Sequence, residues 1–185
     1  LTKVFGLIAP VILESFFPKK AKALGLGKKQ ELTKSSHATL VGVAEKTAAL
    51  LGCQLPTLYQ GGEGTVAVIQ ADDNALTVSP TFAKETSTKA IAYQMARQMT
   101  YLRHEHRLAR YFDLHALQGL YMAAGCAVNP NFAVRVRHDL PKDQASQAVH
   151  FIQEAALVLK QQLKPEAQGL LRSSIEVVEK TFRTH

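Results

Sequence analysis

The apolar residues of this chain repeat at the spacing of an α-helix on both sides of one short stretch, residues 57–79. Inside that stretch, short runs of β-forming residues are separated by turn-forming pairs such as Gly61-Gly62 and Asp72-Asp73. A helix repeats every 3.6 residues and a strand every two, so the change of period marks a change of structure. The pattern predicts an α+β fold that is mainly α: two helices, a small antiparallel sheet and then four helices.

Proline, glycine and capping residues set the expected bounds of these elements. The first helix covers residues 4–16 and must end before Pro18, and the second starts near Ser35-Ser36 and stops at Gly52. The expected strands are residues 57–60, 65–70 and 76–79. The expected later helices are residues 91–102, 117–124, 142–163 and 165–182, with Pro165 in the first turn of the last one.

Composition describes an ordinary globular protein of 185 residues, with 46% hydrophobic and 20% charged residues. The longest apolar run, residues 4–17, is broken by Glu14 and is shorter than the ~20 residues that a membrane crossing needs. Cys53 and Cys126 lie far apart with no CxxC spacing, which favours a reducing, cytoplasmic setting over a disulfide framework. Because the chain does not begin with Met, we expect it to be one piece of a longer protein.

Positive charge is concentrated in two blocks, although the chain as a whole carries a net charge of only +7. One block is residues 19–29, and the other is residues 103–110, where Arg103, His106, Arg107 and Arg110 are predicted to form an anion-binding or partner-binding patch. Solvated helix faces are the more common meaning of such blocks. Binding to nucleic acid or to an anionic surface is therefore retained as an alternative function.

The segment from Leu40 to His106 resembles the M48-type gluzincin metallopeptidase domain. The resemblance rests on an amphipathic helix ending at Leu51-Gly52, on the segment 55–59, on a strand at residues 74–78 and on a following helix that leads to residues 102–106. In that family, the helix after the sheet carries HExxH, whose two His bind Zn²⁺ and whose Glu acts as the general base. The resemblance implies a zincin-like core at residues 35–126, between an N-terminal helix and link (1–34) and C-terminal helices (127–185) of one domain.

Placed on that motif, this chain has Arg97 and Tyr101 at the two His positions and Gln98 at the Glu position. A guanidinium stays protonated, an amide cannot accept a proton as a general base, and a phenol is a rare zinc ligand. The later Glu that would supply a third ligand is also missing, because no Glu occurs between Glu105 and Glu154. We therefore expect no metal, no cofactor and no peptidase activity, with Arg97, Gln98 and Tyr101 lining a vestigial cleft.

The chain is also similar to uncharacterised C-terminal domains of myxobacterial tetratricopeptide-repeat proteins. The similar segments are residues 24–29, 48–52, 96–106 and 127–132. This resemblance implies a non-catalytic interaction or scaffold domain of a larger bacterial protein, with a protein as its partner. An enzyme that uses the old cleft for new chemistry is a third hypothesis, but no set of residues supports it.

Other residues that could carry chemistry have simpler explanations. His104 and His106 point to different faces of a helix, so together with His115 they are expected to be surface residues rather than metal ligands. The glycines of residues 61–64 lack the strand and helix context of a phosphate-binding loop and are expected to form a hairpin turn. Cys53 and Cys126 are expected to be inert, buried thiols.

Overall fold

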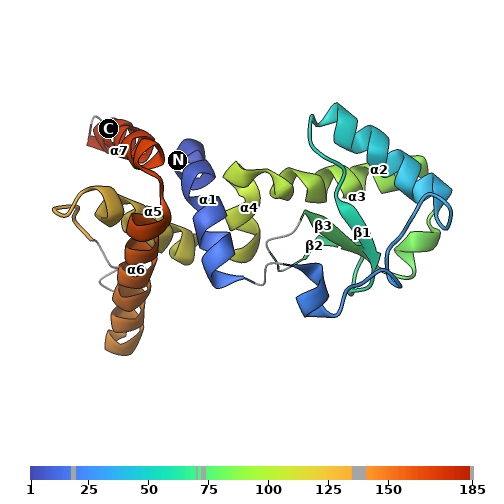
Figure 1. The fold of residues 1–185 in the computed structure, drawn as a ribbon, viewed down its shortest axis with the longest axis horizontal. Coiled ribbons are helices and arrows are strands. Elements are labelled where there is room, and N and C mark those ends of the chain that lie inside the picture. The colour runs from blue at the N-terminus through green and yellow to red at the C-terminus, as the bar shows by residue number, and fades with distance from the viewer. Residues whose placement is uncertain (18–19, 70, 72–73, 135–140, 184–185) are drawn as a thin grey trace. The chain divides into compact units, whose positions relative to one another are not determined.

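The computed structural model describes residues 1–17, 20–69, 71, 74–134 and 141–183. The chain forms two compact units. The sheet unit comprises residues 17–103, and the helical unit combines residues 1–16 with residues 104–185. These boundaries lie at 16/17 and 103/104, whereas the sequence suggested internal boundaries after residues 34 and 126. The mainly helical α+β class predicted from the sequence is confirmed (Figure 1).

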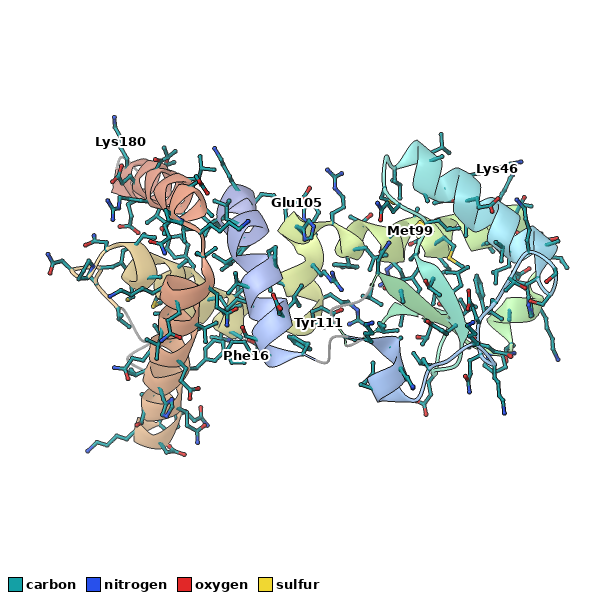
Figure 2. All side chains as sticks on the ribbon, viewed as in Figure 1. Phe16, Lys46, Met99, Glu105, Tyr111 and Lys180 are labelled. Carbon is teal, nitrogen blue, oxygen red and sulfur yellow. The ribbon has the colours of Figure 1, made fainter. Side chains whose placement is uncertain are left out.

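The described residues of the sheet unit form two α-helices and three short strands. They are α2 (Ala38–Leu50), β1 (Thr57–Gln60), β2 (Val66–Val68), β3 (Ala75–Val78) and α3 (Thr88–Met99). Short 3-10 helices occur at Ala21–Leu24, Phe82–Lys84 and Thr100–Leu102. The helix α2 packs on α3, and α3 contacts β2. Lys46, on the outer side of α2, points into solvent (Figure 2).

The sheet is mixed, so the prediction of an antiparallel sheet is wrong. Its strand order is β1-β3-β2; β2 is antiparallel to β3, but β1 is parallel to β3, with Leu58 opposite Leu76. The loop 61–64 therefore does not form a hairpin between neighbouring strands; it carries the chain from β1 to β2 on the other side of β3. Gly62 and Gly64 have φ of 77° and 87°, which side chains disfavour, and these glycines let the loop turn.

The outer edge of β1 is covered by the link that precedes α2. Leu32 N donates to Leu58 O at 2.8 Å, and Gln60 N donates to Gln30 O at 2.6 Å, around an antiparallel bridge between Glu31 and Tyr59. The link then enters α2 without the predicted serine cap. His37 occupies the N-cap position, while Ser36 Oγ accepts a hydrogen bond from Thr33 N instead. Gly52 follows the end of α2 with a φ of 63°, as its predicted stop position requires.

Five α-helices lie in the part of the helical unit that the structure describes. They are α1 (Thr2–Phe16), α4 (His104–Tyr111), α5 (Leu114–Val128), α6 (Lys142–Gln162) and α7 (Pro165–Arg183). α1 contacts the other four, and α5 packs along α6. The buried side chains of α1 are Val4, Ile8, Ala9, Ile12 and Leu13. The sequence predicted a buried stripe of Val4, Ile8, Val11, Ile12 and Phe16, of which Val11 is half-buried and Phe16 is exposed. Phe16, labelled in Figure 2, lies at the end of α1 with its ring centroid 6.5 Å from that of Phe151.

Five α-helices follow the sheet among the described residues, where the sequence predicted four. The difference is α4, which is separated from α3 because Arg103 is extended, with φ −70° and ψ 135°. The helix α5 continues through Gly125, which the sequence indicated as one bound, and ends at Val128, directly before the other bound at Asn129-Pro130. The helix α7 begins at Pro165 as predicted, and α6 ends one residue before the predicted end. No helix in the described part of the chain is long and apolar enough to cross a membrane.

Candidate functional site

The helix α3 carries Arg97 and Gln98 of the predicted vestigial cleft, Tyr101 follows in the 3-10 helix, and the start of α3 follows from local sequence. Ser87 begins the helix, because its Oγ accepts a hydrogen bond from Ala90 N at 3.3 Å. Ile91, Met95 and Met99 form a fully buried stripe, as the apolar spacing predicted. The 3-10 helix at Thr100–Leu102 continues from the end of α3.

The three cleft residues differ in exposure. Arg97 is exposed on α3, Gln98 is only 8% exposed, and Tyr101 is half-buried in the 3-10 helix. Gln98 Oε1 is buried and has no hydrogen-bond partner among the described residues. A buried polar atom without a partner costs about 1–3 kcal/mol. Gln98 is thus the one cleft residue whose polar group is held inside the protein at an energetic cost.

A second glutamine ties the same side of α3 to the sheet. Thr65, which directly precedes β2, donates from its Oγ1 to Gln94 Oε1 at 3.3 Å. Gln94 and Gln98 are four residues apart, so their side chains neighbour each other on the surface of α3. The side of α3 that carries Gln98 is therefore the side that also contacts β2.

The side chains of Arg97 and Gln98 supply hydrogen-bonding groups and one positive charge. Arg97 offers several N–H donors in a planar fork that suits a carboxylate, and the amide of Gln98 offers both a donor and an acceptor. Neither side chain can take a proton from a water molecule near neutral pH. Among the described residues, no group of three or more His, Cys, Asp or Glu is placed to hold a metal ion.

The predicted anion patch is not a single exposed helix face. Arg107 is only 6% exposed, and Arg103 precedes α4 and belongs to the sheet unit. Arg110 is exposed and His106 is half-buried, both on α4. The spacing of Arg103, Arg107 and Arg110 suggested one face because it assumed a helix through all three positions, whereas α4 begins at His104.

The first basic block lies on the surface of the sheet unit. Lys20, Lys22, Lys28 and Lys29 are all exposed, and none has an ion-pair partner among the described residues; Lys19 lies outside them. By contrast, Lys34 pairs with Glu45 at 2.6 Å between Nζ and Oε2. The ammonium groups of these four lysines are therefore accessible to a ligand from solvent.

Sequence reasoning did not single out a groove of about 540 Å³ in the helical unit. The groove lies against α6 and is lined by Cys126, Val134, Val149, Ile152, Gln153, Ala156, Leu157 and Lys160. The available signal was the apolar row of α6, which includes Leu157 at 56% exposure. Leu157 therefore stays at the surface although α6 has packed on α5.

Cys53 and Cys126 are free and half-buried. Burial raises the pKa of the Cys126 thiol above its ordinary value, so this thiol is neutral near pH 7. Both thiols are less buried than the sequence predicted.

No match was found when the chain was compared with protein-family models, with curated proteins and with solved structures.

Proposed function

We propose that this chain is a non-catalytic interaction domain with a zincin-like sheet unit, in which the Arg97, Gln98 and Tyr101 side of α3 binds a protein partner. The observation that carries the proposal is the buried Gln98 side chain, whose Oε1 has no partner among the described residues. Buried polar groups without a partner are rare in folded proteins, and each calls for an explanation, of which a functional role is one. Here Gln98 occupies the position that resembles the general-base position of a peptidase.

The partner that suits this side of α3 is an extended peptide segment or loop. Gln98 Oε1 is buried on the side of α3 that contacts β2, so it accepts a hydrogen bond from a bound peptide N–H only if the groups that cover it move on binding. The exposed Arg97 can pair with a carboxylate of the same segment. Both interactions hold a peptide without activating water for its hydrolysis.

The test is a screen of a displayed peptide library against the full chain, followed by calorimetry with the peptides obtained. We expect Arg97→Ala and Gln98→Met each to weaken binding about tenfold, since each removes one hydrogen-bonding partner of the peptide. Lys89→Ala is the matched control, because Lys89 is exposed in the first turn of the same helix. Gln98→Met should retain or improve folding stability, because it removes a buried acceptor that has no partner.

Two results would overturn the proposal. One is zinc at one equivalent in purified protein together with peptide hydrolysis that a chelator abolishes. The other is a set of peptide ligands whose affinity is unchanged by both α3 substitutions.

A second candidate function is binding to nucleic acid or another polyanion through the basic block of the sheet unit. Its specific support is that Lys20, Lys22, Lys28 and Lys29 are exposed without ion pairs among the described residues. Lysines that neutralise phosphates release counterions, so the affinity should fall steeply with added salt.

Replacing these four lysines with Gln should weaken binding to single-stranded DNA in 50 mM salt. It should also reduce the slope of log affinity against log salt by up to ~3, at ~0.7 per phosphate contact. A matched variant that replaces Lys46, Lys84, Lys89 and Lys164 loses the same charge elsewhere and should keep the slope. Equal effects of the two variants, or no binding at low salt, would exclude this function for the block.

A further inference from the structure

The groove of the helical unit runs along one face of α6 and is mainly apolar. Six of its lining residues come from α6 and repeat at three- and four-residue spacing, from Val149 to Lys160. This row spans about 16 Å at 1.5 Å per residue. Ile152 lies deepest, at 3% exposure, while Leu157 is 56% exposed. The row of α6 is therefore buried at Ile152 and open to solvent at Leu157.

The opposite wall is built by α5 and by the turn that follows it. Cys126 comes from α5 and Val134 from the chain beyond the turn. The ring of Phe132 lies directly over Gly125 and meets the ring of Tyr121 edge-on, at 6.1 Å between centroids. Arg172 of α7 donates to Val128 O at 3.0 Å, which fixes the end of α5. These contacts hold the wall in place without any ligand.

The chemistry of the lining is apolar with one cation at an end. Five of the eight lining side chains are Val, Ile, Leu or Ala, and the Cys126 thiol stays neutral because burial raises its pKa. Lys160 is the last residue of the row, and its ammonium has no partner among the described residues. Gln153 adds an exposed amide midway along the row. A molecule with a long apolar body and an anionic end matches this distribution.

We propose that this groove binds a linear fatty carboxylate, with its chain along α6 and its carboxylate at Lys160. A volume of about 540 Å³ falls within the range of about 300–1,000 Å³ that is typical of small-molecule sites. A partner helix as long as the row, about 10 Å across, would fill about 1,200 Å³. The groove therefore holds an alkyl chain within its volume, whereas a helix would lie mostly outside it. The site uses only the helical unit and is independent of the α3 side of the sheet unit.

The experiment titrates the full chain with hexanoate, octanoate, decanoate and dodecanoate below their micelle concentrations, by calorimetry. Affinity should rise by up to about fourfold for each added methylene, since each one leaves water for the groove. Lys160→Gln should weaken dodecanoate by up to about fivefold, the range of an exposed ion pair, and should leave dodecanol unchanged. Ala156→Phe should weaken both ligands at least tenfold, because its ring fills the groove.

Matched controls separate the site from general effects of charge and surface. Lys164→Gln removes a nearby exposed lysine outside the lining, and Gln144→Phe adds the same apolar ring to α6 away from it. Both should bind dodecanoate like the unmodified chain. If Ala156→Phe does not fold, by far-UV circular dichroism, Lys160→Gln still decides the question, because it changes only an exposed side chain.

Three outcomes would overturn the proposal. The first is that dodecanoate shows no saturable binding. The second is that Lys160→Gln lowers the affinities for dodecanoate and dodecanol equally. The third is that an amphipathic helical peptide binds more tightly than dodecanoate and displaces it. The last result would identify the groove as a docking site for a helix.

Discussion

Replacing Gly125 with alanine should destabilise the helical unit, because the ring of Phe132 occupies the space that a side chain needs. A Cβ at this position would lie 2.5 Å from one ring carbon of Phe132 and 2.6 Å from two others. Ordinary contacts of a Cβ begin at 3.4 Å, so the ring must retreat by about an ångström. That retreat disturbs the edge-on contact of Phe132 with Tyr121.

The magnitude is best expressed against Gly169→Ala in α7. A Cβ at Gly169 would meet no atom within 4 Å, so this change should stabilise the chain by about 0.4–1 kcal/mol through helix propensity and a more restricted unfolded state. Gly125→Ala has the same propensity gain but adds overpacking, which costs about 1–3 kcal/mol. Because the propensity term cancels in the comparison, Gly125→Ala should be less stable than Gly169→Ala by about 1–3 kcal/mol.

The assay is urea unfolding followed by far-UV circular dichroism, because the chain has no tryptophan to serve as a fluorescent probe. A double-mutant cycle isolates the cause: with Phe132→Ala already in place, Gly125→Ala should become as stabilising as Gly169→Ala. If Gly125→Ala stabilises the otherwise unmodified chain as much as Gly169→Ala does, Phe132 does not pack on Gly125. The described packing that supports the α5 wall of the groove would then be wrong as well.

Three further predictions concern single side chains. Gln98→Glu should destabilise the sheet unit by several kcal/mol at pH 7 and less at pH 4, since burial raises the pKa of the new carboxyl and the unfolded chain ionises first. Urea unfolding at both pH values checks this, and Gln94→Glu should change stability by under about 0.5 kcal/mol. Burial, with a hydrogen bond to Glu179, raises the pKa of Tyr121 to about 12, so its stabilising effect is complete below pH 10 and lost as pH rises through 12. The shift from 10 would correspond to about 2.7 kcal/mol, and screening of a half-exposed group reduces it to about 1 kcal/mol; the stability difference from Tyr121→Phe should shrink by that amount between pH 10 and 12. Asp113→Ala should cost about 1 kcal/mol in thermal unfolding, because the carboxylate that caps α5 at 2.8 Å is removed, and an unchanged midpoint would contradict that role.

Local patterns in the sequence determined which segments are helices and where most of them end. The end of α1 before Pro18, the glycine after α2 and the proline that begins α7 are all consequences of backbone restrictions at single residues. The buried stripe of α3 could likewise be read from the spacing of Ile91, Met95 and Met99. Such features need only residues that are neighbours along the chain.

The tertiary structure decided every relation between distant residues. The apolar stripe of α1 shows that the helix is packed but does not name α4–α7 as its partners. Short strands of similar composition do not specify that β1 pairs with β3 in parallel. The sequence identified Gln98 as a cleft residue but could not show that its Oε1 is buried without a partner among the described residues, nor that the ring of Phe132 packs over Gly125. Pairing and burial depend on the free energy of the whole packed unit, to which residues far apart in sequence contribute jointly.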